Sequence, residues 1–301
     1  MKKKITILLS IIAFIFIGGE IALRTFLGLA NAPLYYASNE YEYIACPNQD
    51  GYRFGNHYHY NSYSQRSEEP DSTKKIILGL GDSVLFGGVQ TDQDSLATSI
   101  FTQETGIQML NISAGSWGPD NCAAYLKKFG LFGAKAMFLL VSSHDAHDNI
   151  DLAHPVVGVH PSYPIKQHLT AWGELLERYL LPRMLPKKKK EADPDQKVLD
   201  GIGIEKNGRV FNPGFEQLAE MAKQANIPLY VYLHADLQEL KESKYNEQGM
   251  EIIDWAEKNH ITLIKELDFH FSEKDYRDGI HINAAGQRKL AEIMKTILVK
   301  E

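Results

Sequence analysis

Residues 76–87 read Ile76-Ile77-Leu78-Gly79-Leu80-Gly81-Asp82-Ser83-Val84-Leu85-Phe86-Gly87. An apolar run followed at once by glycine, aspartate and serine is typical of a buried strand that ends in a tight turn. Glycines on both sides of Ser83 allow the backbone to turn sharply and to expose the hydroxyl at the end of the strand. Ser83 is therefore a candidate nucleophile.

Further apolar runs alternate with amphipathic segments along the rest of the chain. Besides residues 76–80, strands are predicted at 107–112, 136–141, 227–233 and 261–264, and helices at 95–104, 121–129, 170–180, 215–224, 246–258 and 284–298. Fully apolar strands separated by helices indicate a parallel sheet that is covered on both faces. The sequence therefore predicts an α/β protein, a three-layer α/β/α sandwich whose active site lies at the carboxyl ends of the strands.

A second polar motif lies near the C-terminus, where the sequence reads Asp278-Gly279-Ile280-His281. A serine hydroxyl becomes nucleophilic at neutral pH only when a base lies within hydrogen-bonding reach, and His281 can be that base. Asp278 on the same loop can hold the imidazole in the required tautomer. Asn283 precedes an amphipathic run and can cap the last helix, which would fix the position of the loop.

Over residues 74–299 these two motifs and the order of the elements resemble the SGNH, or GDSL-type, hydrolase superfamily. The resemblance implies a flavodoxin-like sheet, with Ser83, Asp278 and His281 as the catalytic residues. It also implies an oxyanion hole to which a backbone N–H of the second conserved block contributes. That block corresponds to residues 111–119 here, where the role falls to Gly115, or to Ser116 in an alternative register.

The third block of the superfamily pattern is altered. The family has an asparagine where this chain has His144, within Ser142-Ser143-His144-Asp145. An imidazole N–H can donate to an oxyanion as an amide does, so His144 is the expected second donor, with Asn149 as a weaker candidate. The polar run 144–148 can also be an ordinary polar loop or a metal cluster, but no third ligand stands at a recognisable spacing. We therefore expect no metal and no cofactor.

The N-terminus carries the signal for localisation. Lys2, Lys3 and Lys4 precede an uncharged apolar run over residues 5–19, which a helix through residue 26 can extend to the length of a membrane span. Basic residues before such a run keep the N-terminus in the cytoplasm, which places the rest of the chain in the periplasm. We expect a single-pass anchor in the inner membrane. Cleavage after Ala30-Asn31-Ala32 is the alternative, although Pro33 disfavours it.

Three regions are expected: an anchor at residues 1–30, an aromatic arm at 31–73, and the hydrolase-like domain at 74–301 with an irregular insertion at 151–208. The arm contains nine tyrosines and phenylalanines, which can pack on the domain or stack on sugars. Its asparagines and arginines loosely resemble the segment that precedes the domain in membrane-anchored bacterial members, some of which take part in polysaccharide O-acetylation. The basic run 187–190 is either a solvated loop or a contact for anionic lipid or polymer.

Composition narrows the possible functions further. The 301 residues are 44% hydrophobic and 23% charged with a net charge of -6, and no basic face indicates nucleic-acid binding. Cys46 and Cys122 can form a disulfide in an oxidising compartment.

The leading hypothesis is a serine-dependent carboxyl-ester hydrolase or O-acetyltransferase that acts on an acylated glycan or a small ester. The alternative is a non-catalytic accessory protein of envelope polysaccharide assembly that uses the fold as a binding platform.

Overall fold

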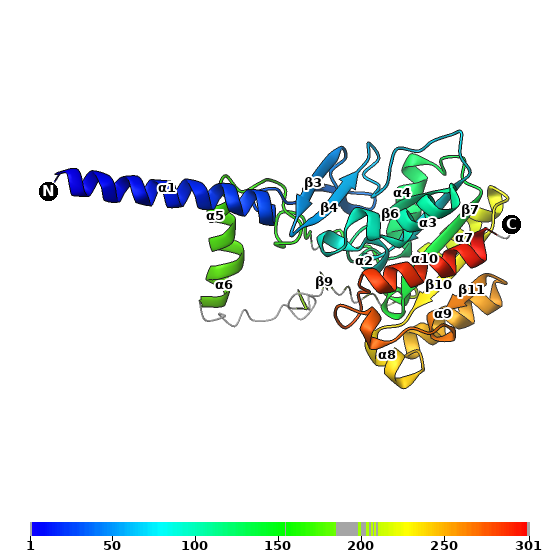
Figure 1. Ribbon diagram of the computed structural model, residues 1–301. Helices are drawn as coiled ribbons and strands as arrows, with labels where there is room; N and C mark the ends of the chain where they lie inside the picture. Colours follow the sequence, from blue (N-terminus) through cyan, green and yellow to red (C-terminus); the bar gives the residue numbers. More distant parts are fainter. Residues whose placement is uncertain are drawn as a thin grey trace.

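The computed structural model describes residues 2–153, 155–184, 198–199, 203–204, 206, 208 and 210–299. A long helix, α1 (Lys2–Leu27), projects from one end of the molecule, and the C-terminus lies at the opposite end (Figure 1). The basic run 187–190, for which two interpretations were open, falls outside the described residues.

The central feature is a parallel sheet of five strands. They are β5 (Ile76–Gly81), β6 (Gln108–Ser113), β7 (Ala136–Ser142), β10 (Leu229–His234) and β11 (Thr262–Lys265). Their order across the sheet is β11-β10-β7-β5-β6, so the first strand of the sheet lies between the second and the third. This is the flavodoxin-like order, in which a ligand site forms where the direction of winding changes, beside β5. The predicted strands and the parallel sheet are confirmed.

Helices cover both faces of this sheet and make it a three-layer sandwich, as predicted. One face packs against α3 (Ala97–Thr105), α10 (Ala284–Leu298) and the short α2 (Ser83–Phe86). The other packs against α4 (Pro119–Phe129), α7 (Gly214–Gln224) and α9 (Glu247–Lys258). A further helix, α8 (Leu237–Glu242), follows β10 and was not predicted.

The arm consists of two antiparallel hairpins that pack on the domain. They are formed by β1 (Tyr35–Ser38) with β2 (Glu42–Ala45), and by β3 (Gln49–Arg53) with β4 (Asn56–Tyr60). Tyr41, Tyr58 and Tyr60 are almost fully buried and belong to the same apolar core as strands β5 and β7. These rings therefore act as core side chains, and the arm is an integral part of the packed structure.

The junction between α1 and the arm contains no loose linker. The amide of Phe54 donates to the carbonyl of Leu27 at 3.0 Å, and the Arg53 guanidinium donates to the carbonyl of Gly28 at 2.9 Å. Leu29 and Ala30, which follow directly, are buried. The helix and the domain are therefore joined by buried, hydrogen-bonded backbone.

Within the insertion, a helical segment leads away from the domain. It consists of α5 (Ala171–Glu174), a wider π-helical stretch η4 (Leu175–Leu180), and α6 (Leu181–Met184). Two strands of two residues each, β8 (Val198–Leu199) and β9 (Gly203–Ile204), pair further along. Cys46 and Cys122 are free thiols, so the disulfide that the sequence allowed is not formed.

Candidate active site

Ser83 is the first residue of α2, and only Asp82 separates it from the end of the interior strand β5 at Gly81. The Asp82 side chain caps this helix by accepting the amide of Val84 at 2.8 Å, and its other oxygen accepts the Ser142 hydroxyl at 3.0 Å. These bonds hold the turn in place and connect it to the end of the neighbouring strand β7. The hydroxyl of Ser83 consequently lies at the carboxyl edge of the sheet, where the sequence placed it.

The structure brings Ser83, His281 and Asp278 together. The Nε2 atom of His281 lies 2.9 Å from Oγ of Ser83, and its Nδ1 lies 2.9 Å from Oδ2 of Asp278. The Asp278 carboxylate also accepts the amides of Ile280 and His281 at 3.0 and 2.8 Å. Partial burial raises the pKa of Asp278, but the hydrogen bonds from His281 and Ile280 outweigh it and hold the pKa well below the usual range. The histidine is thus oriented by a carboxylate that stays ionised.

A cavity of about 310 Å³ opens over the Ser83 hydroxyl. Polar and aromatic side chains from the arm, the insertion and the C-terminal loop line it, among them Tyr35, Arg53, Gln90, His160, Ser162, Tyr163, Arg178 and Arg277. The wall therefore offers several cationic and hydrogen-bonding groups close to a nucleophile-base pair. Such an arrangement can bind a polar or anionic molecule and present one of its carbonyl groups to Ser83.

Similarity to known proteins is found at the level of three-dimensional structure. No family model matches the chain, and no curated protein sequence matches it. Solved structures similar to it include a member of the lipolytic protein G-D-S-L family from Veillonella parvula, with 10% identity and a TM-score of 0.42 over 75% of this chain and 100% of that chain. The esterase EstA from Pseudoalteromonas has 13% identity and a TM-score of 0.40, over 75% and 98%. A two-domain esterase active on acetylated mannans has 9% identity and a TM-score of 0.43, over 75% and 49%.

The topology of this chain identifies its fold. The sheet has the flavodoxin-like order, a serine follows its first strand, and the aspartate-histidine pair lies just before its last helix. The chain has the SGNH hydrolase fold. The segments expected to be the second and third blocks follow strands β6 and β7, and these strands lie on either side of β5, which ends next to Ser83.

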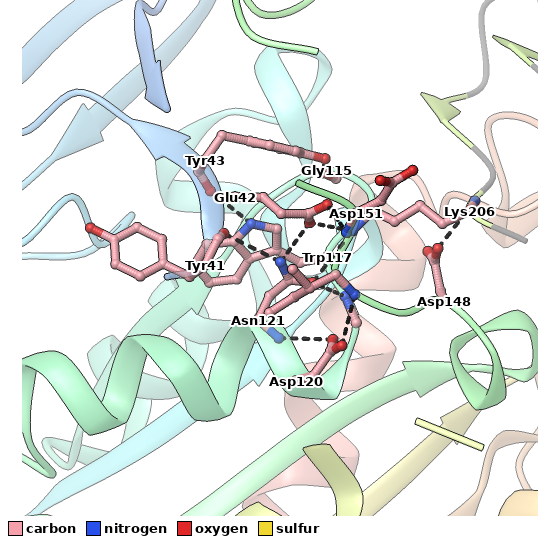
Figure 2. A network of polar contacts seen from close by, with 12 residues as sticks. Tyr41, Glu42, Tyr43, Gly115, Trp117, Asp120, Asn121, Asp148, Asp151 and Lys206 are labelled. Atoms are coloured by element: carbon pink, nitrogen blue, oxygen red, sulfur yellow. Dashed lines mark hydrogen bonds and ion pairs between the residues drawn. The ribbon is translucent and has the colours of Figure 1, made fainter. Parts of the chain in front are cut away.

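Gly115, the expected backbone donor in the second block, lines the cavity together with Ser116. A Cβ atom at position 115 would lie 2.7 Å from the Tyr163 hydroxyl, so a side chain there would displace this ring. The Tyr43 hydroxyl donates to the carbonyl of Gly115 at 2.7 Å and so fixes the orientation of its peptide (Figure 2). The glycine is required by the close approach of the insertion and is held in position by the arm.

A buried polar network continues from this loop (Figure 2). Asn121 at the start of α4 accepts the amide of Gly118 and donates to the carboxylate of Glu42, which also pairs with the Lys206 ammonium. Burial raises the pKa of the nearby Asp148 to about 8. Glu42 on β2 thus connects the arm, the second block and the insertion. Sequence reasoning missed this residue, because a single glutamate in a short strand usually faces solvent.

His144 lies in the 3-10 turn η3 (Ser143–Ala146) after β7. Its side chain is 39% exposed, and its Nε2 atom is 3.8 Å from Oδ1 of Asp145. It is not among the described residues that line the cavity, whereas Gly115 is. Potential ligand atoms of Asp82, His144 and Asp145 lie within 4.8 Å of one another. Both oxygens of Asp82 are engaged by protein donors, however, and burial together with Asp82 raises the pKa of Asp145 well above its usual range.

One further histidine supports the catalytic loop, and sequence reasoning missed it. His234 ends the interior strand β10 and is fully buried, with Nδ1 2.7 Å from the Glu266 carboxylate and Nε2 2.7 Å from the carbonyl of Ile280. The Tyr276 hydroxyl bonds to the same carboxylate and to the carbonyl of Ala235. Burial acts to lower the pKa of His234, but Glu266 raises it to about 9. A charged His234 donates both of its N–H groups and holds the loop 278–281 against the sheet.

Arg66 holds the turn that follows α2, the short helix that begins at the candidate nucleophile Ser83. This fully buried guanidinium donates to the carbonyls of Phe86, Gly88 and Thr91, which form the turn after α2. Arg277 donates to the carbonyl of Gly87 at 3.0 Å and so connects the same turn to the catalytic loop. Arg66 is one of the arginines of the arm that resemble the segment preceding the domain in membrane-anchored members, and these three hydrogen bonds are the physical reason for an arginine at this position.

Proposed function

We propose that this protein is a serine-dependent carboxyl-ester hydrolase or O-acetyltransferase. The observation that carries the proposal is the 2.9 Å contact between Oγ of Ser83 and Nε2 of His281, with Asp278 bonded to the opposite ring nitrogen. This is the arrangement in which a histidine accepts the proton of an attacking serine and a carboxylate stabilises the imidazolium that forms.

The reaction would proceed in two halves. Ser83 Oγ attacks the carbonyl carbon of the ester while His281 Nε2 takes the hydroxyl proton, and the tetrahedral intermediate collapses as His281 protonates the departing alcohol. An acyl group is then attached to Ser83. In the second half His281 deprotonates either water, which gives hydrolysis, or a sugar hydroxyl, which gives transfer.

For the oxyanion hole we propose the backbone N–H of Gly115 and the imidazole N–H of His144. Gly115 lines the cavity beside Ser83. His144 follows β7, the direct neighbour of β5, and its ring nitrogen lies close to the Asp82 carboxylate, next in the chain to the nucleophile. Two preorganised donors aimed at the developing negative charge are the usual requirement for such a site.

The proposed substrate is an acylated glycan of the cell envelope. The cavity wall carries arginine, histidine, serine and tyrosine side chains, which suit the hydroxyl and acidic groups of a sugar better than a long alkyl chain. We also propose that α1 spans the inner membrane once, with residues 31–73 as an arm and 74–301 as a periplasmic catalytic domain that has an insertion at 151–208. The helix from Lys3 to Leu27 is long and apolar enough to cross a membrane, and a signal sequence fits the same description.

The test is labelling with a fluorophosphonate, which reacts with activated serines. The wild type is expected to be labelled and Ser83→Ala to be unlabelled. Ser162→Ala is the matched control, because Ser162 lines the same cavity and should leave labelling intact. Labelling that persists in Ser83→Ala would refute the role of Ser83.

The replacement of the family asparagine by His144 favours one alternative, a non-catalytic accessory protein that binds envelope glycan in this cavity. It predicts a folded wild type that neither reacts with the fluorophosphonate nor releases acetate from acetylated oligosaccharides, yet binds them. Acetate release that depends on Ser83 would exclude it.

A further inference from the structure

The helical segment 171–184 of the insertion has two faces of different chemistry. Thr170 caps its start, and the segment then continues through α5, η4 and α6 without interruption. Pro182 has no N–H to donate, which accounts for the wider π-helical turn before it. In Figure 1 this segment runs across the direction of α1 and begins beside it.

One face is turned toward the catalytic domain. Glu174 is fully buried, accepts the amide of Ala30 at 2.5 Å and pairs with the Arg53 guanidinium. Four residues later Arg178 lines the catalytic cavity. Residues four apart lie on the same side of a helix, so this side is fixed against the arm and the active site.

The other face is apolar and exposed. Leu176, Leu180 and Met184 are again spaced four apart, and they are 47%, 41% and 73% exposed. They stand two positions away from Glu174 and Arg178, which places them on the opposite side of the helix. Three large apolar side chains in a row on the surface indicate a partner of apolar chemistry.

Trp172 begins the same row and packs against α1. Its ring stacks on Phe16 of α1 with centroids 5.9 Å apart, and its indole N–H donates to the Phe16 carbonyl at 3.0 Å. A Cβ atom at position 19 would lie 2.3 Å from this ring, so Gly19 leaves the room that the indole occupies. The carboxylate of Glu20 accepts the amides of Ala171 and Trp172. The segment therefore leaves α1 at the point where its apolar run ends, with its apolar face on the side of that run.

We propose that residues 172–184 form an in-plane membrane helix, whose row Trp172, Leu176, Leu180 and Met184 is buried in the headgroup boundary of the bilayer that holds α1. The inference rests on the proposed membrane span of α1. A helix with one apolar face, lying across a spanning helix at the interface and carrying a tryptophan there, has the properties of an interfacial helix. Because Arg178 on its other face lines the cavity, the active site is held close to the membrane surface.

The experiment uses the full-length chain in lipid vesicles, with Cys46→Ser to remove the accessible native thiol. An environment-sensitive fluorophore is attached in turn to Leu180→Cys on the apolar row, to Glu177→Cys as the control on the same helix, and to Phe14→Cys within α1. The side chain of Glu177 is 67% exposed and lies off the row. We expect blue-shifted emission, and loss of fluorescence with lipids that carry quenchers in their acyl chains, at positions 180 and 14 but not at 177.

The three positions separate the possible failures. If the fluorophore at position 180 is in water while the one at position 14 is in lipid, the in-plane helix is wrong and the membrane anchor is still supported. Fluorophores in water at both positions would overturn the anchor and the inference together. None of these readings depends on catalysis, so the ester chemistry is tested separately.

Discussion

At the scale of single residues, the proposed mechanism requires opposite behaviour of His281 and Asp278 toward protons. His281 would gain and lose a proton in each turnover, while Asp278 would stay ionised throughout, and the lowered pKa of Asp278 meets the second requirement. We therefore expect activity on a short acyl ester to fall at low pH with the slope of a single proton, the one that His281 gains. A profile of kcat/KM against pH checks this.

Asp278→Asn is the matched variant for that profile. It removes the carboxylate and keeps the size of the side chain, so kcat should fall by about 10⁴ because the imidazole loses the partner that fixes its tautomer. A two-proton slope in the wild type, or near wild-type turnover of Asp278→Asn, would show that the carboxylate does not have this role.

His144 is the residue in which this site departs from the superfamily pattern. If its imidazole donates to the oxyanion, His144→Ala should lower kcat by about 10²–10³ with little change in KM, because the contact strengthens in the transition state. His144→Asn should recover part of the loss. Steady-state kinetics of both variants test this, with circular dichroism to verify folding. Unchanged kinetics of the alanine variant would show that the imidazole does not donate to the oxyanion and that its contact with Asp145 is its only role.

The sequence predicted those residues of the site that lie in local motifs. Ser83, Asp278 and His281 stand in short patterns whose spacing has a chemical reason, and the structure brings them within hydrogen-bonding distance. His234 could not be recognised, because it stands at the end of an apolar strand and its partners Glu266 and Ile280 are far away in the sequence. Long-range buried contacts leave no local signal.

At the scale of elements, strand β10 and the catalytic loop are held together by a buried charge. The pKa of His234 is raised to about 9 from an unfolded value of 6.5, so the charged form stabilises the fold fully below pH 6.5, and this contribution is lost as pH rises through 9. The contribution amounts to about 3 kcal/mol at most. His234→Gln should therefore flatten the decline of Tm between pH 6.5 and 9, as measured by thermal unfolding, and an unchanged decline would contradict the charged state.

Elements with a strong hydrophobic pattern were predicted to within a few residues. The strands of the sheet are fully apolar and the helices amphipathic, so both periods stand out. The short helix α2 was read as a turn, because four residues give no period, and α8 was missed for the same reason. The π-helical stretch η4 falls within the helix predicted at 170–180, and periodicity alone does not distinguish these two types of helix.

At the scale of the whole molecule, the arm belongs to the core of the domain. A chain that begins at Pro33 should be folded and active, whereas a chain that begins at Lys74 should be insoluble. Each buried aromatic side chain contributes about 1.5–3 kcal/mol, and the arm supplies five buried tyrosines to the core: Tyr35, Tyr41, Tyr43, Tyr58 and Tyr60. Their summed contribution is comparable to the free energy of unfolding of a typical domain, which is about 5–15 kcal/mol. Soluble expression and fluorophosphonate labelling of the two truncations decide the matter, and an active chain from Lys74 would contradict it.

The junction of α1 with the arm, where buried hydrogen-bonded backbone replaces a linker, determines how far the active site can reach. A catalytic domain on a flexible tether sweeps a hemisphere, and its range grows with the length of the tether. With α1 in the membrane as proposed, we expect a domain on this stiff junction to work at one height above the bilayer. It would meet its substrates by lateral diffusion of α1, and it would select ester groups by their distance from the bilayer before any side chain recognises their chemistry.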